Sequence, residues 1–253
     1  MQIIGIIPTR YASTRFEGKP LCDIAGKTMV QRVYENAKRA NLLSEVWIAT
    51  DDTRIFDHVQ QFGGKVVMTS SNHQSGTDRC AEAIKINQSQ ANVVINIQGD
   101  EPLIHPEQID ELAELFTNPQ IQIGTLVKKI TSASDLFDPN LPKVIINKQN
   151  QALYFSRQTI PFLRDVSPDK WFDLHSFYSH VGMYGFRTSV LKSLVQLPPS
   201  SLELAEKLEQ LRWLENGYTI YTHLTNYKNI AIDTPEDLEK VLRLMETNNT
   251  RHD

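Results

Sequence analysis

The stretch QIIGIIP, residues 2–8, decides the fold of this chain. It is an apolar run rich in β-branched isoleucine and ended by a proline, which is typical of a parallel strand buried on both faces. A helical pattern follows, which Thr28 is expected to cap and which reaches about Asn41. The first strand and the first helix therefore form one βα unit.

The same alternation continues through the first half of the chain. Strands are expected at residues 45–50, 65–68 and 93–97; helices are expected at 54–62, from a cap at Thr77 or Asp78 to Ile86, and at 107–116 behind Pro106. Four βα units in a row imply a parallel sheet with helices on both faces and right-handed crossovers.

The rhythm changes after Ile121. Short strands are expected at residues 124–130, 143–147, 152–155, 181–187, 219–223 and 230–232; a mobile polar loop is expected at 164–175, a long helix at 202–215 ended by Gly217, and a last helix from Pro235 to about Met245. We interpret this pattern as one α/β domain with an inserted β-rich lobe.

Composition and charge exclude several classes of protein. The 253 residues carry a formal net charge of −4, so a basic nucleic-acid binder is not expected. Two cysteines, Cys22 and Cys80, are too few for a disulfide framework or a four-ligand zinc site. We find no apolar run long enough for a membrane span and no basic leader, and therefore expect a cytoplasmic protein without membrane insertion.

The loop after the first strand carries three cations, Arg10, Arg15 and Lys19. It lacks the G-x-G-x-x-G dinucleotide fingerprint, and Gly26-Lys27-Thr28 lacks the first glycine of a P-loop. Guanidinium forks and an ammonium could hold a polyphosphate at this position. The alternative is a solvated basic loop.

Two aspartates follow predicted strands. Asp100 lies in Gln-Gly-Asp-Glu-Pro, residues 98–102, and Asp233 follows the strand expected at 230–232. The carboxyl ends of parallel strands share one edge of a sheet, and Mg²⁺ favours one or two carboxylates together with substrate phosphates. Asp233 could instead cap the last helix. Two strand-end aspartates beside a cationic loop indicate metal-assisted nucleotidyl transfer.

Other polar stretches leave two interpretations open. Ser75 and Gly76 could pair with a base edge, because glycine permits close approach of the backbone, but they also suit a turn and a helix start. Glu203, Glu206 and Glu209 are spaced three apart, so they would lie near one another on a helix and could carry chemistry together. They also fit an ordinary charged helix face.

Seven blocks in order carry a resemblance that runs from the first strand to the last helix. They are residues 10–20, 73–79, 98–102, 152–157, 180–186, 208–212 and 233–237. Together they resemble the 3-deoxy-manno-octulosonate cytidylyltransferases, the CMP-Kdo synthetases of Gram-negative bacteria. Thr9 and Glu17 depart from residues frequent in that family, Ala and Pro.

The resemblance implies an α/β fold, a nucleotide-diphospho-sugar transferase-like Rossmann-type, mostly parallel sheet with helices on both faces and an inserted β-rich lobe. It implies a single cytidylyltransferase domain, 1–253, with a nucleotide-binding part at about 1–120 plus 228–247 and a sugar-binding and dimerisation lobe at about 121–227. It further implies a Mg²⁺-dependent homodimer that converts CTP and Kdo into CMP-Kdo and pyrophosphate for lipopolysaccharide synthesis.

The same resemblance assigns roles to individual residues. Asp100 and Asp233 would bind Mg²⁺ and, with Lys19 and Arg15, form the catalytic group; Thr9, Arg10, Lys19, His73, Ser75, Gly76, Arg79 and Gln98 would bind the nucleotide; Arg157 would take the Kdo carboxylate, and His180, Tyr184, Glu209 and Gln210 the sugar hydroxyls. Arg157 could instead pair with a structural carboxylate such as Asp165.

Three other functions compete with this interpretation. A CMP-sialate synthetase, or another CTP-dependent activator of an acidic sugar, would share the nucleotide loop and differ on the sugar side. A glycosyltransferase would be expected to carry a D-x-D metal pair, whereas residues 100–101 are Asp-Glu. A nucleotide-sensing scaffold would have the cationic loop without both strand-end carboxylates.

Overall fold

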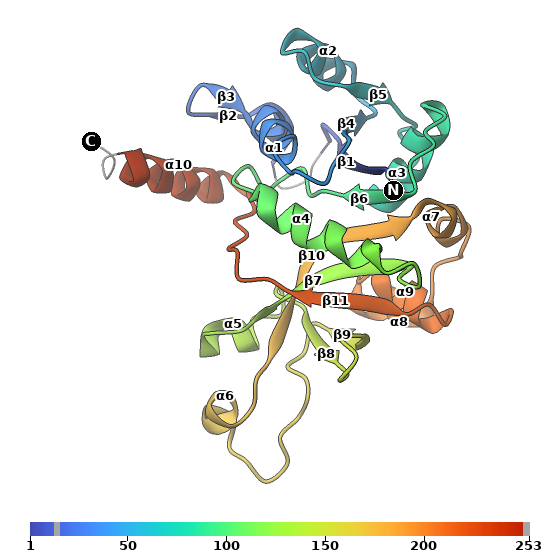
Figure 1. The fold of residues 1–253 in the computed structure, drawn as a ribbon. Coiled ribbons are helices and arrows are strands. Elements are labelled where there is room, and N and C mark those ends of the chain that lie inside the picture. Colours follow the sequence, from blue (N-terminus) through green and yellow to red (C-terminus); the bar gives the residue numbers. More distant parts are fainter. Residues whose placement is uncertain (13–15, 250–253) are drawn as a thin grey trace. The chain divides into compact units, whose positions relative to one another are not determined.

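The computed structural model describes residues 1–12 and 16–249 (Figure 1). The chain divides into two compact units, unit 1 with Met1–Asp110 and Tyr227–Asp253, and unit 2 with Glu111–Asn226. In the described part of the chain, no helix is both long enough and apolar enough to cross a membrane.

Unit 1 contains a parallel sheet in the order β6-β1-β4-β5. The strands are β1 (Ile3–Thr9), β4 (Glu45–Thr50), β5 (Val66–Met68) and β6 (Val93–Asn96). Successive side chains of a strand point to opposite faces, yet Ile3, Ile4, Ile6 and Ile7 are all at most 4% exposed. Both faces of β1 are therefore covered, as the apolar run predicts.

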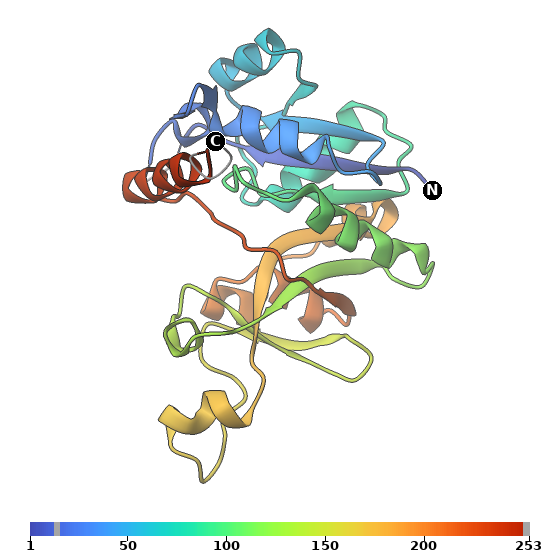
Figure 2. The same cartoon turned by 60° about the vertical axis from the view of Figure 1, so that its left-hand side comes forward.

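The helices of unit 1 follow these strands. They are α1 (Met29–Ala37), α2 (Thr53–Gln61), α3 (Gly76–Ile86), α4 (Pro106–Glu114, which runs on into unit 2) and α10 (Pro235–Asn249), with the short turn η1 (Lys19–Leu21) and a hairpin of β2 (Asp23–Ile24) and β3 (Lys27–Thr28) before α1. Helix α1 packs along β1 and β4 (Figure 2). Thr28 caps it as predicted, its hydroxyl accepting from the Gln31 N–H.

Unit 2 is rich in antiparallel pairs. Its elements are η2 (Leu115–Thr117), β7 (Ile123–Lys129), α5 (Ala133–Phe137), β8 (Lys143–Ile146), β9 (Ala152–Ser156), η3 (Pro168–Lys170), α6 (Trp171–Leu174), β10 (Tyr178–Arg187), α7 (Thr188–Leu194), α8 (Ser201–Glu206), α9 (Gln210–Glu215) and β11 (Ile220–Leu224). Strand β10 pairs antiparallel with β7 and β8, β8 pairs antiparallel with β9, and β11 pairs parallel with β7.

Two expectations for unit 2 were wrong. The long helix expected at 202–215 is two short helices, because Lys207 takes the left-handed conformation with φ 54° and ends α8. The polar loop expected at 164–175 contains η3 and α6, and Trp171 is only 5% exposed within an apolar cluster with Ile130, Leu136 and Phe177. Burial of this large ring orders a segment whose sequence is mostly polar.

The strand expected at residues 230–232 is also absent from the described chain. Ile232 is fully buried in a cluster with Ile24, Met29 and Val241. The apolar side chains that suggest a strand are used to attach the chain before α10 to the β2–β3 hairpin and the start of α1.

Candidate active site

The side chains of Lys19, Asp100 and Asp233 meet in unit 1. The Lys19 Nζ lies 3.1 Å from Asp100 Oδ2 and 3.2 Å from Asp233 Oδ1. The lysine side chain is 14% exposed, and those of the two aspartates are 30% and 40% exposed. One ammonium thus joins two carboxylates that lie 133 positions apart in the sequence, at Asp100 and Asp233.

Backbone contacts build this cluster from three separate segments. Lys19 begins η1 directly after Gly18, whose φ of 70° favours glycine at that position. Asp100 follows Gly99, where an added Cβ would lie 3.1 Å from the Pro8 carbonyl oxygen, so a larger residue would push the loop after β6 a few tenths of an ångström away from β1. The Ile232 N–H donates to the Asp100 carbonyl at 2.9 Å and brings the chain before Asp233 alongside.

Thr234, and not Asp233, caps the first turn of α10. The Asp237 N–H donates to the Thr234 hydroxyl at 3.4 Å, and the Asp237 carboxylate accepts from the N–H groups of Asp233 and Thr234. This is a reciprocal capping arrangement with Thr234 in the capping position. The Asp233 carboxylate faces Lys19 instead. The capping role of Asp237 was not predicted, although the pattern Thr-x-x-Asp at residues 234–237 is a signal for it.

The donor set fits a magnesium ion. Two carboxylates are hard oxygen ligands, and Mg²⁺ commonly takes one or two carboxylates and completes its shell with water and phosphate oxygens. Within residues 1–12 and 16–249, no three His, Cys, Asp or Glu side chains gather into a complete protein cage for a metal. The Lys19 ammonium holds a positive charge between the two carboxylates.

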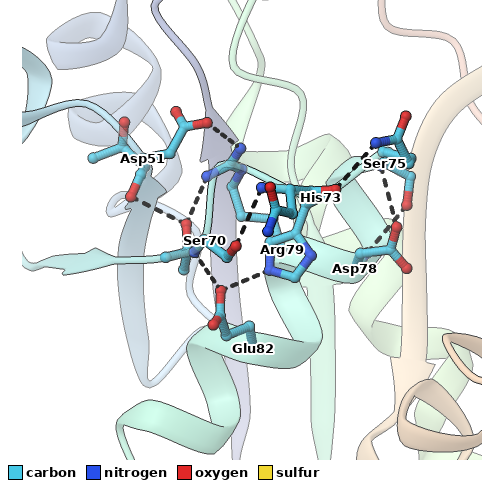
Figure 3. Close-up of polar contacts among 11 residues, drawn as sticks. Asp51, Ser70, His73, Ser75, Asp78, Arg79 and Glu82 are labelled. Carbon is cyan, nitrogen blue, oxygen red and sulfur yellow. Dashed lines mark hydrogen bonds and ion pairs between the residues drawn. The ribbon is translucent and has the colours of Figure 1, made fainter.

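Four residues predicted to bind nucleotide lie at the start of α3 or just before it (Figure 3). They are His73, Ser75, Gly76 and Arg79. Ser75, rather than Thr77 or Asp78, caps the helix: its hydroxyl accepts from the Asp78 N–H at 3.1 Å, and Asp78 accepts from the Ser75 N–H at 3.2 Å. A Cβ on Gly76 would lie 3.0 Å from Pro8 Cγ, so the helix start packs closely on the end of β1. The cap therefore lies two or three residues before the predicted positions.

Arg79 and His73 hold the loop that precedes α3 through side-chain hydrogen bonds (Figure 3). Arg79 is 4% exposed and donates to Thr69 Oγ1 at 2.6 Å and Asp51 Oδ2 at 2.9 Å, joining the segments after β4 and β5. The His73 Nε2 lies 2.6 Å from a Glu82 carboxylate oxygen that also accepts from the backbone. These contacts position the loop around Ser75, and direct contact of either side chain with nucleotide stays a prediction.

The remaining nucleotide residues are placed in different ways. Thr9 is 5% exposed at the end of β1, with its hydroxyl donating to the Ile7 carbonyl at 3.2 Å. Arg10 is exposed, and Gln98 is half-buried in the loop before Asp100. Arg15 lies outside the described residues.

The predicted sugar residues all belong to unit 2. His180 and Tyr184 lie on β10 with their rings 5.1 Å apart, Glu209 directly precedes α9, and Gln210 begins it. Burial lowers the pKa of His180 to about 3, so this imidazole is neutral near pH 7. Its Nε2 lies 3.1 Å from the Thr125 hydroxyl.

Two buried polar groups of this cluster point to a ligand. The Tyr184 hydroxyl and the Gln210 Nε2 have no hydrogen-bond partner among the described residues, although these residues are only 6% and 4% exposed. Burial also raises the pKa of Tyr184 well above its ordinary value, so the hydroxyl keeps its proton. Because buried polar groups are nearly always paired, these atoms are suited to sugar hydroxyls.

Arg157 contacts backbone rather than a structural carboxylate. Its guanidinium donates to the carbonyls of Glu206 at 2.7 Å, Pro139 at 3.1 Å and Lys207 at 3.3 Å, while Asp165 pairs with Arg164. The proposed alternative partner Asp165 was therefore wrong. These bonds use three of the five N–H groups that an arginine side chain has. The two N–H groups that remain lie one on each of the two terminal nitrogens.

Comparison with known proteins decides the family. Residues 4–230 match a family model described as cytidylyltransferase. A 3-deoxy-manno-octulosonate cytidylyltransferase of Parabacteroides distasonis is 55% identical over 249 residues, covering 97% of this chain and 98% of the relative. One of Cytophaga hutchinsonii is 53% identical over 242 residues, covering 95% and 96%. The chain belongs to the 3-deoxy-manno-octulosonate cytidylyltransferase family.

A solved structure supports the fold of this cytidylyltransferase. It is described as CMP:2-keto-3-deoxy-manno-octonic acid synthetase complexed with CTP, and it matches with a TM-score of 0.91 at 42% identity, covering 98% of this chain and 100% of that one. The family resemblance and the predicted α/β fold class are thereby confirmed. The partition into a nucleotide part and a sugar lobe, and the roles of individual residues, stay predictions.

Proposed function

We propose that this chain transfers CMP from CTP to Kdo, releasing pyrophosphate and forming CMP-Kdo for lipopolysaccharide synthesis. The observation that carries the proposal is the 55% identity over 97% of the chain to a 3-deoxy-manno-octulosonate cytidylyltransferase. The Lys19–Asp100–Asp233 cluster supports it, because a nucleotidyl transfer needs cations and carboxylates at one point.

The reaction forms a bond between the anomeric oxygen of Kdo and the α-phosphorus of CTP. It breaks the bond between that phosphorus and the oxygen that bridges the α- and β-phosphates. The anomeric hydroxyl gives up its proton to solvent, and pyrophosphate leaves with the electron pair of the broken P–O bond. The protein then has two tasks, to hold the two reacting groups in line and to balance charge.

Residues of unit 1 suit the nucleotide half of this reaction. Asp100 and Asp233 would hold Mg²⁺, which when bound supplies positive charge to the α-phosphate and the attacking oxygen. Lys19, held between these carboxylates at 3.1 and 3.2 Å, is placed to balance charge that develops on pyrophosphate. Thr9 and Gly76 would form part of the base pocket, with Arg10 toward the triphosphate.

Residues of unit 2 suit the acceptor. Tyr184 and Gln210 offer buried polar atoms that lack partners among the described residues, and a sugar hydroxyl would satisfy them. Neutral His180 can donate or accept one hydrogen bond without adding charge. The two remaining N–H groups of Arg157, one on each terminal nitrogen, would be available to the Kdo carboxylate.

Two further properties belong to this proposal. We expect a homodimer, because Phe137, Phe162 and Leu174 of unit 2 are 48%, 75% and 65% exposed, and such apolar groups are favourably covered by a partner. We expect a cytoplasmic location, because CTP is a cytoplasmic substrate. Light scattering after gel filtration tests the first expectation, and fractionation of cells the second.

A coupled pyrophosphate-release assay tests the activity directly. The purified chain is given Mg²⁺, one nucleotide and one acidic sugar, with CTP or ATP and with Kdo or a sialic acid. We expect turnover with CTP and Kdo, and a kcat/KM at least about 100-fold lower with ATP, because a base-edge pocket rejects a different hydrogen-bonding pattern. Turnover of sialic acid in place of Kdo would favour the CMP-sialate alternative.

A further inference from the structure

A buried polar network lies beside the two site carboxylates of unit 1. The Gln108 Nε2 donates to Asn229 Oδ1 at 2.8 Å, and the Asn229 Nδ2 donates back to Gln108 Oε1 at 3.0 Å. The same Nδ2 donates to Glu101 Oε2. Gln108 is fully buried and Glu101 is 8% exposed, so each bond replaces one that water could have made.

This network holds the two segments that carry the site carboxylates. Glu101 follows Asp100 directly, and Asn229 lies four residues before Asp233. The Ile232 N–H donates to the Asp100 carbonyl at 2.9 Å, so the chain before α10 is attached at both ends of a short stretch. Gln108 belongs to α4, a regular element that provides a fixed support.

The segment at residues 226–233 needs such attachment. It contains no helix or strand, so no ladder of backbone bonds fixes its path. Fixing each of its residues costs conformational entropy, and specific side-chain bonds must offset that cost. Asn229 is well suited, because one carboxamide both donates and accepts.

We propose that the Asn229–Gln108–Glu101 network is a positioning device that sets how Asp100 and Asp233 present their carboxylates to a divalent cation. This inference rests on the proposed role of these two aspartates. In this proposal the three network residues are positioning residues that act through the backbone of the two aspartates. Removal of outer partners of a metal site typically costs 10–100-fold in metal affinity or activity.

Two variants test the network at different strengths. Asn229→Ala removes all three bonds, and Gln108→Met removes the paired amide bonds while the Asn229–Glu101 bond is kept. Asn41→Ala is a matched control, because the Asn41 Nδ2 donates to Asp110 Oδ2 at 3.1 Å in the same unit but contacts none of the site residues. Circular dichroism and thermal unfolding show whether each variant is folded.

The first readout is binding of Mn²⁺ alone, followed by electron paramagnetic resonance without substrate. The second is the Mg²⁺ concentration at half-maximal turnover, with kcat and the KM for CTP measured at saturating Mg²⁺. We expect both network variants to bind Mn²⁺ at least about 10-fold more weakly and to need correspondingly more Mg²⁺. Their kcat at saturating Mg²⁺ should return to within about threefold of the parent, and Asn41→Ala should match the parent throughout.

Several results would overturn the proposal. They are parent-like Mn²⁺ and Mg²⁺ dependence in folded Gln108→Met, a kcat that stays low at saturating Mg²⁺ with unchanged metal affinity, or no Mn²⁺ binding by the parent chain. If Asn229→Ala does not fold, Gln108→Met alone decides. A parent chain that binds Mn²⁺ but transfers nothing to Kdo would refute the proposed function and leave the network to be judged on Mn²⁺ affinity.

Discussion

Replacing Lys19 with methionine should make the stability of this chain depend on divalent cation. The substitution keeps the length of the side chain and removes the ammonium that lies 3.1 Å from Asp100 and 3.2 Å from Asp233. Without the ammonium, the carboxylates of Asp100 and Asp233 repel each other, because the backbone bond from Ile232 to Asp100 keeps the two segments side by side.

The magnitude follows from the distances and the exposure. At about 3 Å and an effective dielectric constant of about 20, each pair attracts by about 5 kcal/mol before desolvation and side-chain entropy are subtracted. Exposed pairs contribute about 0–1 kcal/mol net, and loss of one partner of a buried pair costs about 3–5 kcal/mol. With a 14% exposed lysine and carboxylates 30% and 40% exposed, we expect a loss of about 2 kcal/mol.

Differential scanning calorimetry with and without Mg²⁺ measures this effect. For a chain of this size, about 2 kcal/mol lowers Tm by about 4–8 °C. Added Mg²⁺ should raise Tm more in Lys19→Met than in the parent, because no ammonium competes for the carboxylates. Lys27→Met is the control, since Lys27 pairs with Glu35 at 45% and 40% exposure and should change stability by no more than about 0.5 kcal/mol.

Two outcomes would refute this reasoning. One is a Lys19→Met variant with the Tm of the parent in the absence of Mg²⁺, which would show that the two pairs contribute nothing net. The other is an equal Mg²⁺ response in both proteins, which would show that the two carboxylates do not form the cation site.

Three further predictions concern the proposed roles. Asp100→Asn or Asp233→Asn should lower kcat/KM in the pyrophosphate-release assay at least about 100-fold with an unchanged circular dichroism spectrum, and parent-like turnover at saturating Mg²⁺ would remove that residue from the metal site. Arg157→Lys should raise the KM for Kdo at least about 10-fold and leave the KM for CTP nearly unchanged, because an ammonium cannot replace the fork; equal changes in both constants would contradict a carboxylate contact. Because burial lowers the pKa of His180 to about 3, the unfolded chain takes up this proton first, so unfolding free energy should fall as pH drops from about 6.5 toward 3. Urea titrations should show a flatter fall for His180→Gln than for the exposed His175→Gln, and identical slopes would count against this assignment.

The sheet of unit 1 was predictable because its strands are specified by short patterns. The isoleucines of β1 are buried on both faces, and the strand expected at residues 45–50 is β4 with the same bounds. A strand buried on both faces needs only a local run of apolar β-branched residues, which a sequence displays directly. The strand order β6-β1-β4-β5 was not predicted, because β6 pairs with β1 rather than with β5, the strand that precedes it in the chain.

The break between α8 and α9 was not predictable from local sequence. The residues around Lys207 favour a continuous helix, and a lysine at φ 54° is unfavourable by itself. Arg157 donates to the carbonyls of Glu206 and Lys207, and the Arg157 N–H donates to the Glu206 carboxylate at 2.9 Å. These partners lie about fifty residues away in the sequence, so a helical pattern cannot reveal them.

The proximity of Asp100 and Asp233 was anticipated on a partly mistaken premise. Both aspartates were expected at the ends of strands of one sheet, but residues 230–232 form no strand in the described chain. The contacts that attach Asp233 beside Asp100 include the backbone bond from the Ile232 N–H and the burial of the Ile232 side chain against Ile24 and Met29. A paired strand at residues 230–232 would have attached this segment beside β6. The backbone bond from Ile232 to Asp100 attaches it there without a strand. The strand-end rule therefore pointed to the right edge of the sheet, whereas the Asn229 bonds that complete the attachment depend on residues more than 120 positions away and leave no local signal.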